Sequence, residues 1–200
     1  MQPNQVEYPI DYLNQIAPEQ KKPGMDGKWV LGLIGLGVVA VIFIAIFFLS
    51  SGTSSTQKLQ TLAARMQTLQ KISDSAEKNI KSSSLRTTNS TLSIFLTNAN
   101  RNIETPLKNN KVDAKKLDKS IVKKEDGSKV TAALEDARLN ATYDRTYGRE
   151  MSFQLDTLHN LMQDIYTSTK SKSLKEFLVS TDDNLTPIRK QLTDFNTTSE

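Results

Sequence analysis

Residues 143–159 read YDRTYGREMSFQLDTLH and end in His159, the single histidine of the chain. Asp156 precedes this histidine by three residues, a variant of the Glu-x-x-His spacing with which helices ligate two metal ions. A two-metal site of that kind needs two such pairs and two further carboxylates, all facing inward. One histidine cannot supply two pairs, so the sequence predicts no di-metal site.

The position of His159 on its predicted helix also argues against a ligand role. Leu155, Leu158 and Met162 define the apolar face, and successive residues turn by about 100°. His159 then lies on the flank of that face and Asp156 on the side toward water. We therefore expect a lone surface histidine, with no metal and no cofactor.

Other chemistries find little support in the composition. The chain has no cysteine, which excludes disulfides, thiolate catalysis and Cys-ligated metal. The acidic pairs 135–136 and 182–183 are adjacent in sequence, so they splay apart on a helix and are expected to be solvated faces or a cap. No glycine-rich phosphate loop is present. The net charge of +4 comes from mixed acidic and basic residues, without the basic patch of a nucleic-acid surface. The sequence predicts neither an enzyme nor a nucleic-acid-binding protein.

An apolar segment predicts a membrane anchor. From Trp29 to Leu49 the chain has a run of 21 residues without a charge, and about 20 helical residues cross the hydrocarbon core of a bilayer. Lys21, Lys22 and Lys28 precede the run, so the positive-inside rule places the N-terminus in the cytoplasm. The lipid bilayer is thus a predicted partner, with the C-terminal domain outside the membrane.

The short N-terminal tail is rich in proline and too small to fold alone. It nevertheless concentrates apolar and aromatic side chains in YPIDYLNQIAP. One interpretation is a docking motif for a cytoplasmic protein, and the other is a stretch without a specific role. The motif residues would be Tyr8, Pro9, Ile10, Asp11, Tyr12, Leu13 and Ile16.

Apolar residues at intervals of three and four predict four long helices after the anchor. The first seam is Leu59, Leu62, Met66, Leu69, Ala76 and Ile80, with Ser73 as its one polar member. The second runs from Leu85 to Leu107 and stops near Pro106, and a short helix is possible within VDAKKLDKSI, with Asp113 near its start. The third long segment runs from Val130 to Ile165, through Ala133, Ala137, Ala141, Tyr147, Met151, Leu155, Leu158 and Met162. The fourth runs from Leu174 to Phe195, where Pro187 should bend or split it. The pattern predicts an all-α fold, a membrane-anchored antiparallel four-helix bundle with one transmembrane helix.

Three stretches resemble the bacterial domain of unknown function 4142, a ferritin-like helical family found in exported proteins. The stretches are KVDAKKLDKSI, YDRTYGREM and SLKEFLVSTDDNLTPIRKQL. The family's aromatic-Asp-Arg run and its Leu-Lys-x-Phe run fall on Tyr143, Asp144, Arg145, Tyr147 and Met151, and on Leu174, Lys175 and Phe177. The resemblance implies a ferritin-like bundle of the bacterial cell envelope. Two histidines usual in that family are replaced here by Leu155 and Ile103, both on predicted core seams.

The predicted organisation is a cytoplasmic tail over residues 1–28, a transmembrane helix over 29–50, a linker over 51–58 and an extracytoplasmic bundle over 59–197. The leading functional hypothesis is a non-catalytic structural or partner-binding module with a protein partner. The alternative is a sensor or ligand-binding ectodomain that signals through a cytoplasmic partner. A metal-binding ferritin-like protein is the third hypothesis.

Overall fold

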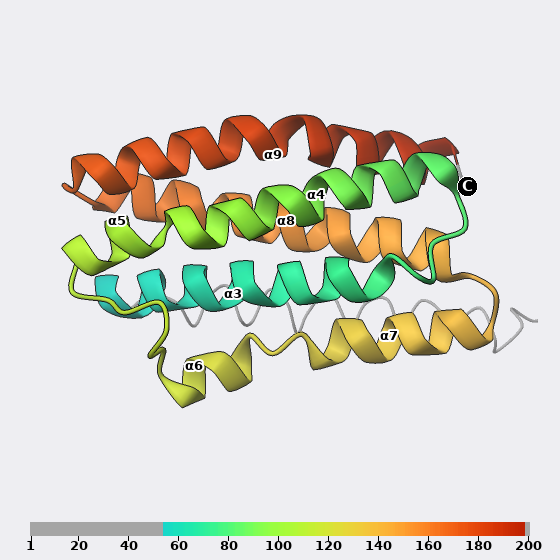
Figure 1. The fold of residues 1–200 in the computed structure, drawn as a ribbon, viewed down its shortest axis with the longest axis horizontal. Coiled ribbons are helices and arrows are strands. Elements are labelled where there is room, and N and C mark those ends of the chain that lie inside the picture. The colour runs from blue at the N-terminus through green and yellow to red at the C-terminus, as the bar shows by residue number, and fades with distance from the viewer. Residues whose placement is uncertain (1–53, 199–200) are drawn as a thin grey trace, which may run out of the picture. The chain divides into compact units, whose positions relative to one another are not determined.

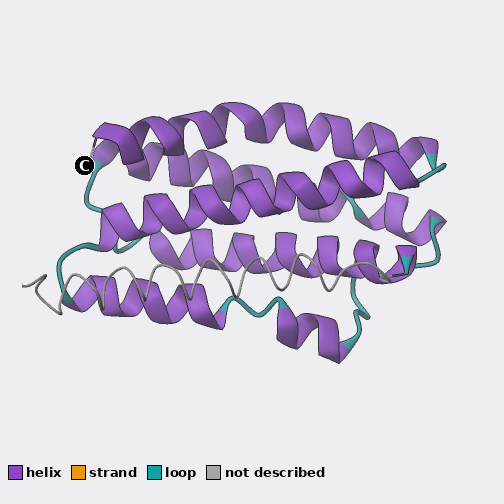
Figure 2. Cartoon of the chain, turned by 180° about the vertical axis from the view of Figure 1, so that it is seen from behind, coloured by secondary structure: helices purple, strands orange, loops and turns teal. Residues whose placement is uncertain are grey.

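The computed structural model describes residues 54–198, which fold into helices without any strand (Figures 1 and 2). In chain order these helices are α3 (Ser55–Ala76), α4 (Ser83–Asn102), α5 (Glu104–Asn109), α6 (Lys119–Lys124), α7 (Ser128–Leu139), α8 (Tyr143–Ser168) and α9 (Lys172–Thr198). The prediction of an all-α fold is confirmed for this part of the chain. Within residues 54–198, none of the helices combines the length and apolarity needed to cross a bilayer. The predicted span and the predicted tail motif, Tyr8 to Ile16, lie outside the described residues.

The four longest helices contact one another in a closed ring. Helix α3 packs against α4 and α8, and α9 packs against the same two helices. Neighbours in the ring run antiparallel, as the ribbon shows (Figure 1). The connection from α4 to α8 contains the three shorter helices, of which α6 contacts α3 and α7 contacts α8.

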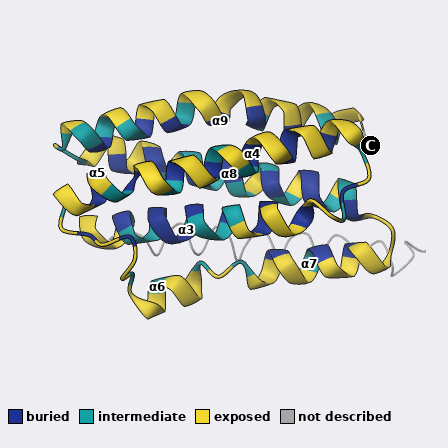
Figure 3. Cartoon of the chain, in the orientation of Figure 1, coloured by how far each residue is buried: buried dark blue, intermediate teal, exposed yellow. Residues whose placement is uncertain are grey.

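The predicted apolar seams form the centre of this ring. Every member of the first seam is buried, including Ser73, and the buried stripes of the long helices face inward (Figure 3). Leu155 and Ile103, which the sequence places on core seams, are both in the core. In α8 the buried residues recur at helical spacing: Tyr147, Met151, Leu155, Leu158, Met162 and Ile165. Burial of these faces holds the helices together.

The prediction of one long third helix is wrong. The segment is divided into α7 and α8 by a turn at residues 140–142, where Ala141 has a φ of 57°. Asn140 ends α7 by donating its side-chain amide to the carbonyl of Asp136, at 2.9 Å. The seam through α7 also differs from the prediction, because Ala141 is exposed and Leu134 is buried instead of Ala133. The left-handed turn lets α7 pack on the outside of the ring, while α8 is one of the four helices that form it.

Pro187 does not split the last helix, which is continuous from Lys172 to Thr198. A proline within a helix removes the donor to the carbonyl four residues earlier, here that of Asp183. Both Pro187 and Asp183 are exposed, so water can take the place of that donor. The predicted heptad of α9 is buried from Leu174 to Leu192, while its last member, Phe195, is only half-buried.

Two further boundaries differ from the predicted ones. Helix α3 begins at Ser55, inside the predicted linker, because Ser54 and Gln57 form a capping box. The short helix expected in VDAKKLDKSI begins only at Lys119, where the carboxylate of Asp118 accepts a hydrogen bond from the amide of Ser120 at 2.7 Å. The segment before it is held by burial of Val112 and Ala114.

Leu158 lies in the centre of the ring with no exposed surface. Leu158→Ala should lower the free energy of unfolding by about 2–5 kcal/mol, because it removes buried methyl groups and leaves a cavity. Chemical denaturation measures the loss. Ile94→Ala is the matched control, since Ile94 is 62% exposed, and should change stability by less than about 0.5 kcal/mol. Equal effects of the two variants would contradict the placement of the core.

Candidate functional site

A buried polar cluster joins three of the four long helices. It consists of Ser73 on α3, Asn89 on α4 and Tyr147 on α8, each with at most 1% of its surface exposed. The Asn89 side-chain oxygen accepts hydrogen bonds from the hydroxyl of Tyr147 and from that of Ser73, the latter at 2.7 Å. The Asn89 amide donates to the backbone carbonyl of Ser73 at 3.1 Å. We call these three residues the polar junction.

Within the polar junction, the polar side-chain groups form hydrogen bonds with one another. Asn89 receives two donors on its oxygen and gives one amide hydrogen to α3, so little bonding capacity is left for a ligand. Burial raises the pKa of the Tyr147 phenol well above its usual range, which keeps the hydroxyl protonated as a donor. This arrangement is that of a satisfied structural network, in which each buried polar group has a partner.

The other residues of YDRTYGREM also connect helices. The carboxylate of Asp144 accepts hydrogen bonds from the amides of Lys81 and Ser82, at 3.0 and 2.6 Å. These amides precede α4, so the first turn of α8 fixes the loop between α3 and α4. The ring of Tyr143 stacks on that of Tyr147, with centroids 6.3 Å apart. The motif therefore positions α8 against two other helices.

Gly148 permits the close approach of α8 and α9. A Cβ atom at this position would lie 2.6 Å from the side-chain oxygen of Asn196 and 2.9 Å from a ring carbon of Phe195. Any larger side chain would have to displace the side chains of Asn196 and Phe195 on α9. The requirement at Gly148 is thus one of space and not of chemistry.

His159 is not the lone surface histidine that the sequence predicts. Its Nδ1 lies 2.5 Å from a carboxylate oxygen of Asp182 on α9, and its side chain is only 18% exposed. The Nε2 atom lies 2.9 Å from the amide of Gln163, one turn further along α8. The prediction is wrong because the flank of α8 that carries His159 faces α9, whereas the prediction places this flank in solvent. Asp182 likewise is half-buried and paired, and not a solvated face or a cap.

Two of the remaining acidic candidates, Asp156 and Glu135, pair with arginines at the surface. Asp156 is exposed, as predicted, and accepts two hydrogen bonds from Arg189, at 2.7 and 2.9 Å. Glu135 pairs with Arg138 on α7, and this guanidinium lowers the pKa of the carboxyl. Neither carboxylate converges with another on a common point. Among residues 54–198, no group of three His, Cys, Asp or Glu side chains is placed to hold a metal ion.

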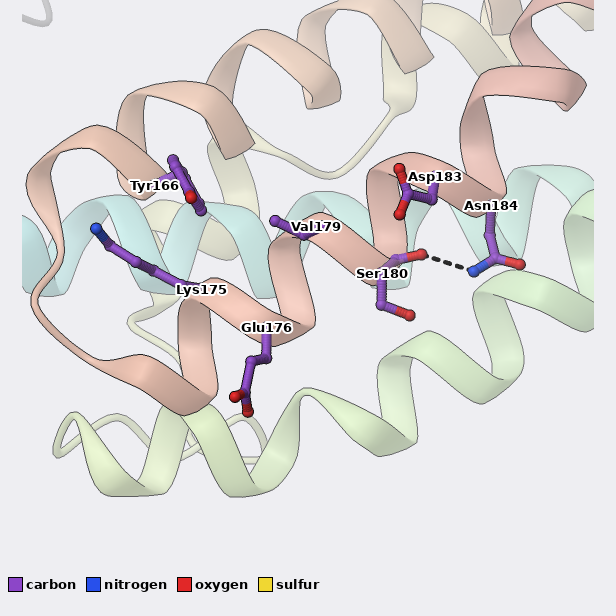
Figure 4. A pocket seen from close by; sticks show the side chains of 7 residues that line it. All are labelled: Tyr166, Lys175, Glu176, Val179, Ser180, Asp183 and Asn184. Atoms are coloured by element: carbon purple, nitrogen blue, oxygen red, sulfur yellow. Dashed lines mark hydrogen bonds between the residues drawn. The ribbon is translucent and has the colours of Figure 1, made fainter.

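A shallow hollow of about 410 Å³ lies on the surface of α8 and α9 (Figure 4). The Lys175 ammonium lies 4.9 Å from the centre of the Tyr166 ring on its wall. Asn184 donates to the backbone carbonyl of Ser180 at 2.6 Å. The lining residues are Tyr166, Lys175, Glu176, Val179, Ser180, Asp183 and Asn184. Of the Leu-Lys-x-Phe run, Lys175 therefore borders this hollow, while Leu174 is in the core and Phe177 is half-buried.

Comparisons with family models, with curated proteins and with solved structures found no match for this chain.

Sequence reasoning missed Asn89 and the hydroxyl of Tyr147, although a signal was available. Asn89 occupies a seam position between Leu85 and Leu92, four residues after one and three before the other. Ser73 interrupts the neighbouring seam in the same way. Two polar residues at predicted core positions require partners, and each proves to be a partner of the other.

The polar junction yields a test of its structural role. Asn89→Ala should cost at least about 2 kcal/mol, because the buried hydroxyls of Ser73 and Tyr147 both lose their acceptor. Tyr147→Phe removes a single hydrogen bond and should cost about 1 kcal/mol for the lost bond. Asn98→Ala, an exposed position on the same helix, is the control and should be close to neutral. Thermal or chemical unfolding ranks the three, and a neutral Asn89→Ala would contradict the network.

The pair of His159 and Asp182 should couple in a double-mutant cycle. We expect about 0.5–1 kcal/mol between His159→Ala and Asp182→Ala, since both side chains are only partly buried. Absence of coupling would mean that the contact does not form in solution.

Elemental analysis of the purified chain should find no stoichiometric metal in either the parent or His159→Ala. One metal per chain, lost on His159→Ala, would instead favour a metal-binding protein.

Proposed function

We propose that this chain is a single-pass membrane protein that displays a non-catalytic helical module outside the membrane. Residues 29–50 form its transmembrane helix, and residues 1–28 form the cytoplasmic tail. The module acts as a structural or partner-binding domain of the cell envelope, without a cofactor.

We further propose that the module is a ferritin-like four-helix bundle. Support comes from the direction of the long helices, because α4 and α8 run the same way along the ring (Figure 1). Joining two parallel helices requires a connection that returns along the bundle, here residues 103–142 with α7. One long crossover of this kind is a feature of ferritin-like bundles.

One observation supports a structural role over a catalytic one. The side chains best suited to chemistry each bond to a group on another helix or its adjoining loop. Tyr147 donates to Asn89, Asp144 accepts from the amides before α4, and His159 contacts Asp182. Catalytic groups need a free reactive atom beside a space for substrate, and here those atoms serve the packing of helices.

The sensor alternative depends on a ligand site, and the hollow on α8 and α9 is the place available to it. This hollow is open to solvent, with an ammonium that already lies over an aromatic ring. Ligand sites generally bury most of their ligand in an enclosed cleft. Because the hollow is open to solvent, it gives little support to the sensor hypothesis, although it is the place on α8 and α9 with room for a ligand.

A partner is tested by cross-linking and affinity capture from intact membranes, with the full chain and with a variant lacking residues 1–20. Capture of one protein by the full chain alone would support docking through Tyr8 to Ile16. Capture by both chains would place the partner on the module outside the membrane. Capture by neither chain would count against a partner-binding role.

The proposed topology predicts the result of limited proteolysis. Protease added to intact cells should digest the module and spare the N-terminal tail, detected with epitope tags at each end. Detergent permeabilisation before digestion is the control and should expose both tags. Loss of the N-terminal tag alone in intact cells would reverse the orientation.

A further inference from the structure

Two stretches distant in sequence, residues 108–119 and 170–172, bring exposed lysines to the same end of the ring. This is the end at which α3 begins, α5 finishes and α8 turns into α9 (Figure 1). Contacts fix the segments there: Lys58 pairs with Asp164 at 2.8 Å, and Gln60 accepts a hydrogen bond from the amide of Asp118 at 2.9 Å. We call the exposed lysines of this end the basic collar: Lys108, Lys111, Lys115, Lys116, Lys119, Lys170 and Lys172.

Most of the basic collar has no acidic partner. Lys115 pairs with Glu104 at 3.2 Å, and Lys172 reaches Glu176 at 3.8 Å. The other five form no ion pair with any residue in the range 54–198. The nearby acids Asp113 and Asp118 accept hydrogen bonds from backbone amides of their own segments. These two carboxylates keep their negative charge, but the seven lysines of the collar outnumber the four acids Glu104, Glu176, Asp113 and Asp118, so this end presents a local excess of positive charge.

Chain connectivity decides what this end can reach. Four residues lie between Leu49, the last of the apolar run, and Ser54, the N-cap of α3, so five residue-to-residue steps join the two. At about 3.3–3.6 Å per residue, these five steps span at most about 18 Å. If residues 29–50 cross a bilayer, as the proposed function states, the end of the module that carries the collar lies next to the lipid headgroups.

We propose that the basic collar binds the anionic lipid headgroups of the membrane in which the chain is anchored, and so holds the module upright on the bilayer. This inference rests on the proposed membrane anchor. Lysines close to an anionic surface are attracted to it within a Debye length, about 10 Å at moderate salt. Each contributes close to a fivefold preference for the docked state at low salt.

The experiment reads the distance of each end of the module from the lipid surface. The full chain is reconstituted in nanodiscs of phosphatidylcholine alone or mixed equally with phosphatidylglycerol. Because the chain has no cysteine, a fluorophore can be placed at Asn109→Cys on the collar end or at Leu139→Cys on the opposite end, where Leu139 is 70% exposed. Energy transfer to a headgroup acceptor is then measured at low and high salt.

We expect stronger transfer from Asn109→Cys in phosphatidylglycerol discs than in phosphatidylcholine discs, with the difference lost at high salt. Replacing four collar lysines by glutamine should lower the ratio of docked to undocked module by at least about tenfold. The variant carries Lys108→Gln, Lys111→Gln, Lys116→Gln and Lys170→Gln. A matched control carries Lys71→Gln, Lys78→Gln, Lys81→Gln and Lys129→Gln, four exposed lysines elsewhere with the same total charge change, and should keep the lipid dependence.

Equal transfer in the two lipids, or equal losses in the two glutamine variants, would overturn the collar. Stronger transfer from Leu139→Cys than from Asn109→Cys would overturn it as well. Alkaline carbonate extraction of native membranes separates this failure from failure of the proposed function. Release of the chain would refute the anchor and the collar together, whereas retention without lipid dependence would refute the collar alone.

Discussion

The side-chain amide of Asn89 sets the register of the helices around it. Apolar heptads alone tolerate sliding, because a leucine moved by one turn meets another leucine. Asn89 cannot move in this way, since a shift of α4 by one turn, about 5.4 Å, would leave the buried hydroxyls of Ser73 and Tyr147 without their acceptor. Each unsatisfied buried group costs about 1–3 kcal/mol. One short amide thus specifies how α3, α4 and α8 align.

The rest of the N-terminal part of α8 follows from that alignment. With Tyr147 fixed against α4, Asp144 lies one turn earlier, beside the amides that precede α4, and Gly148 lies next to the end of α9. The acidic and aromatic residues of this stretch thus need no catalytic role to account for them. Each satisfies a condition of packing that the polar junction creates.

Periodicity predicted the parts of the fold that depend on burial. The seams of α3, α8 and α9 were correct because apolar residues every three to four positions have one physical meaning in a long helix. The turn at Asn140 and Ala141 was missed, since neither glycine nor proline marks it and the apolar pattern continues across it. The pairing of His159 with Asp182 was missed for another reason. A helical wheel assigns a residue to a flank but does not say which neighbour covers that flank.

The long crossover determines how far the C-terminal end of the module lies from the point where the chain enters it. Without α7, four antiparallel helices would return the chain to the end where it started. The extra pass places Ser54 and the last turn of α9 at opposite ends of the ring (Figure 1). Helix α9 has 27 residues, a length of about 40 Å at 1.5 Å per residue. Anything fused to or recognised at the C-terminus would therefore stand roughly a bilayer's thickness away from the point where the chain enters the module, so the domain is also a spacer of fixed length.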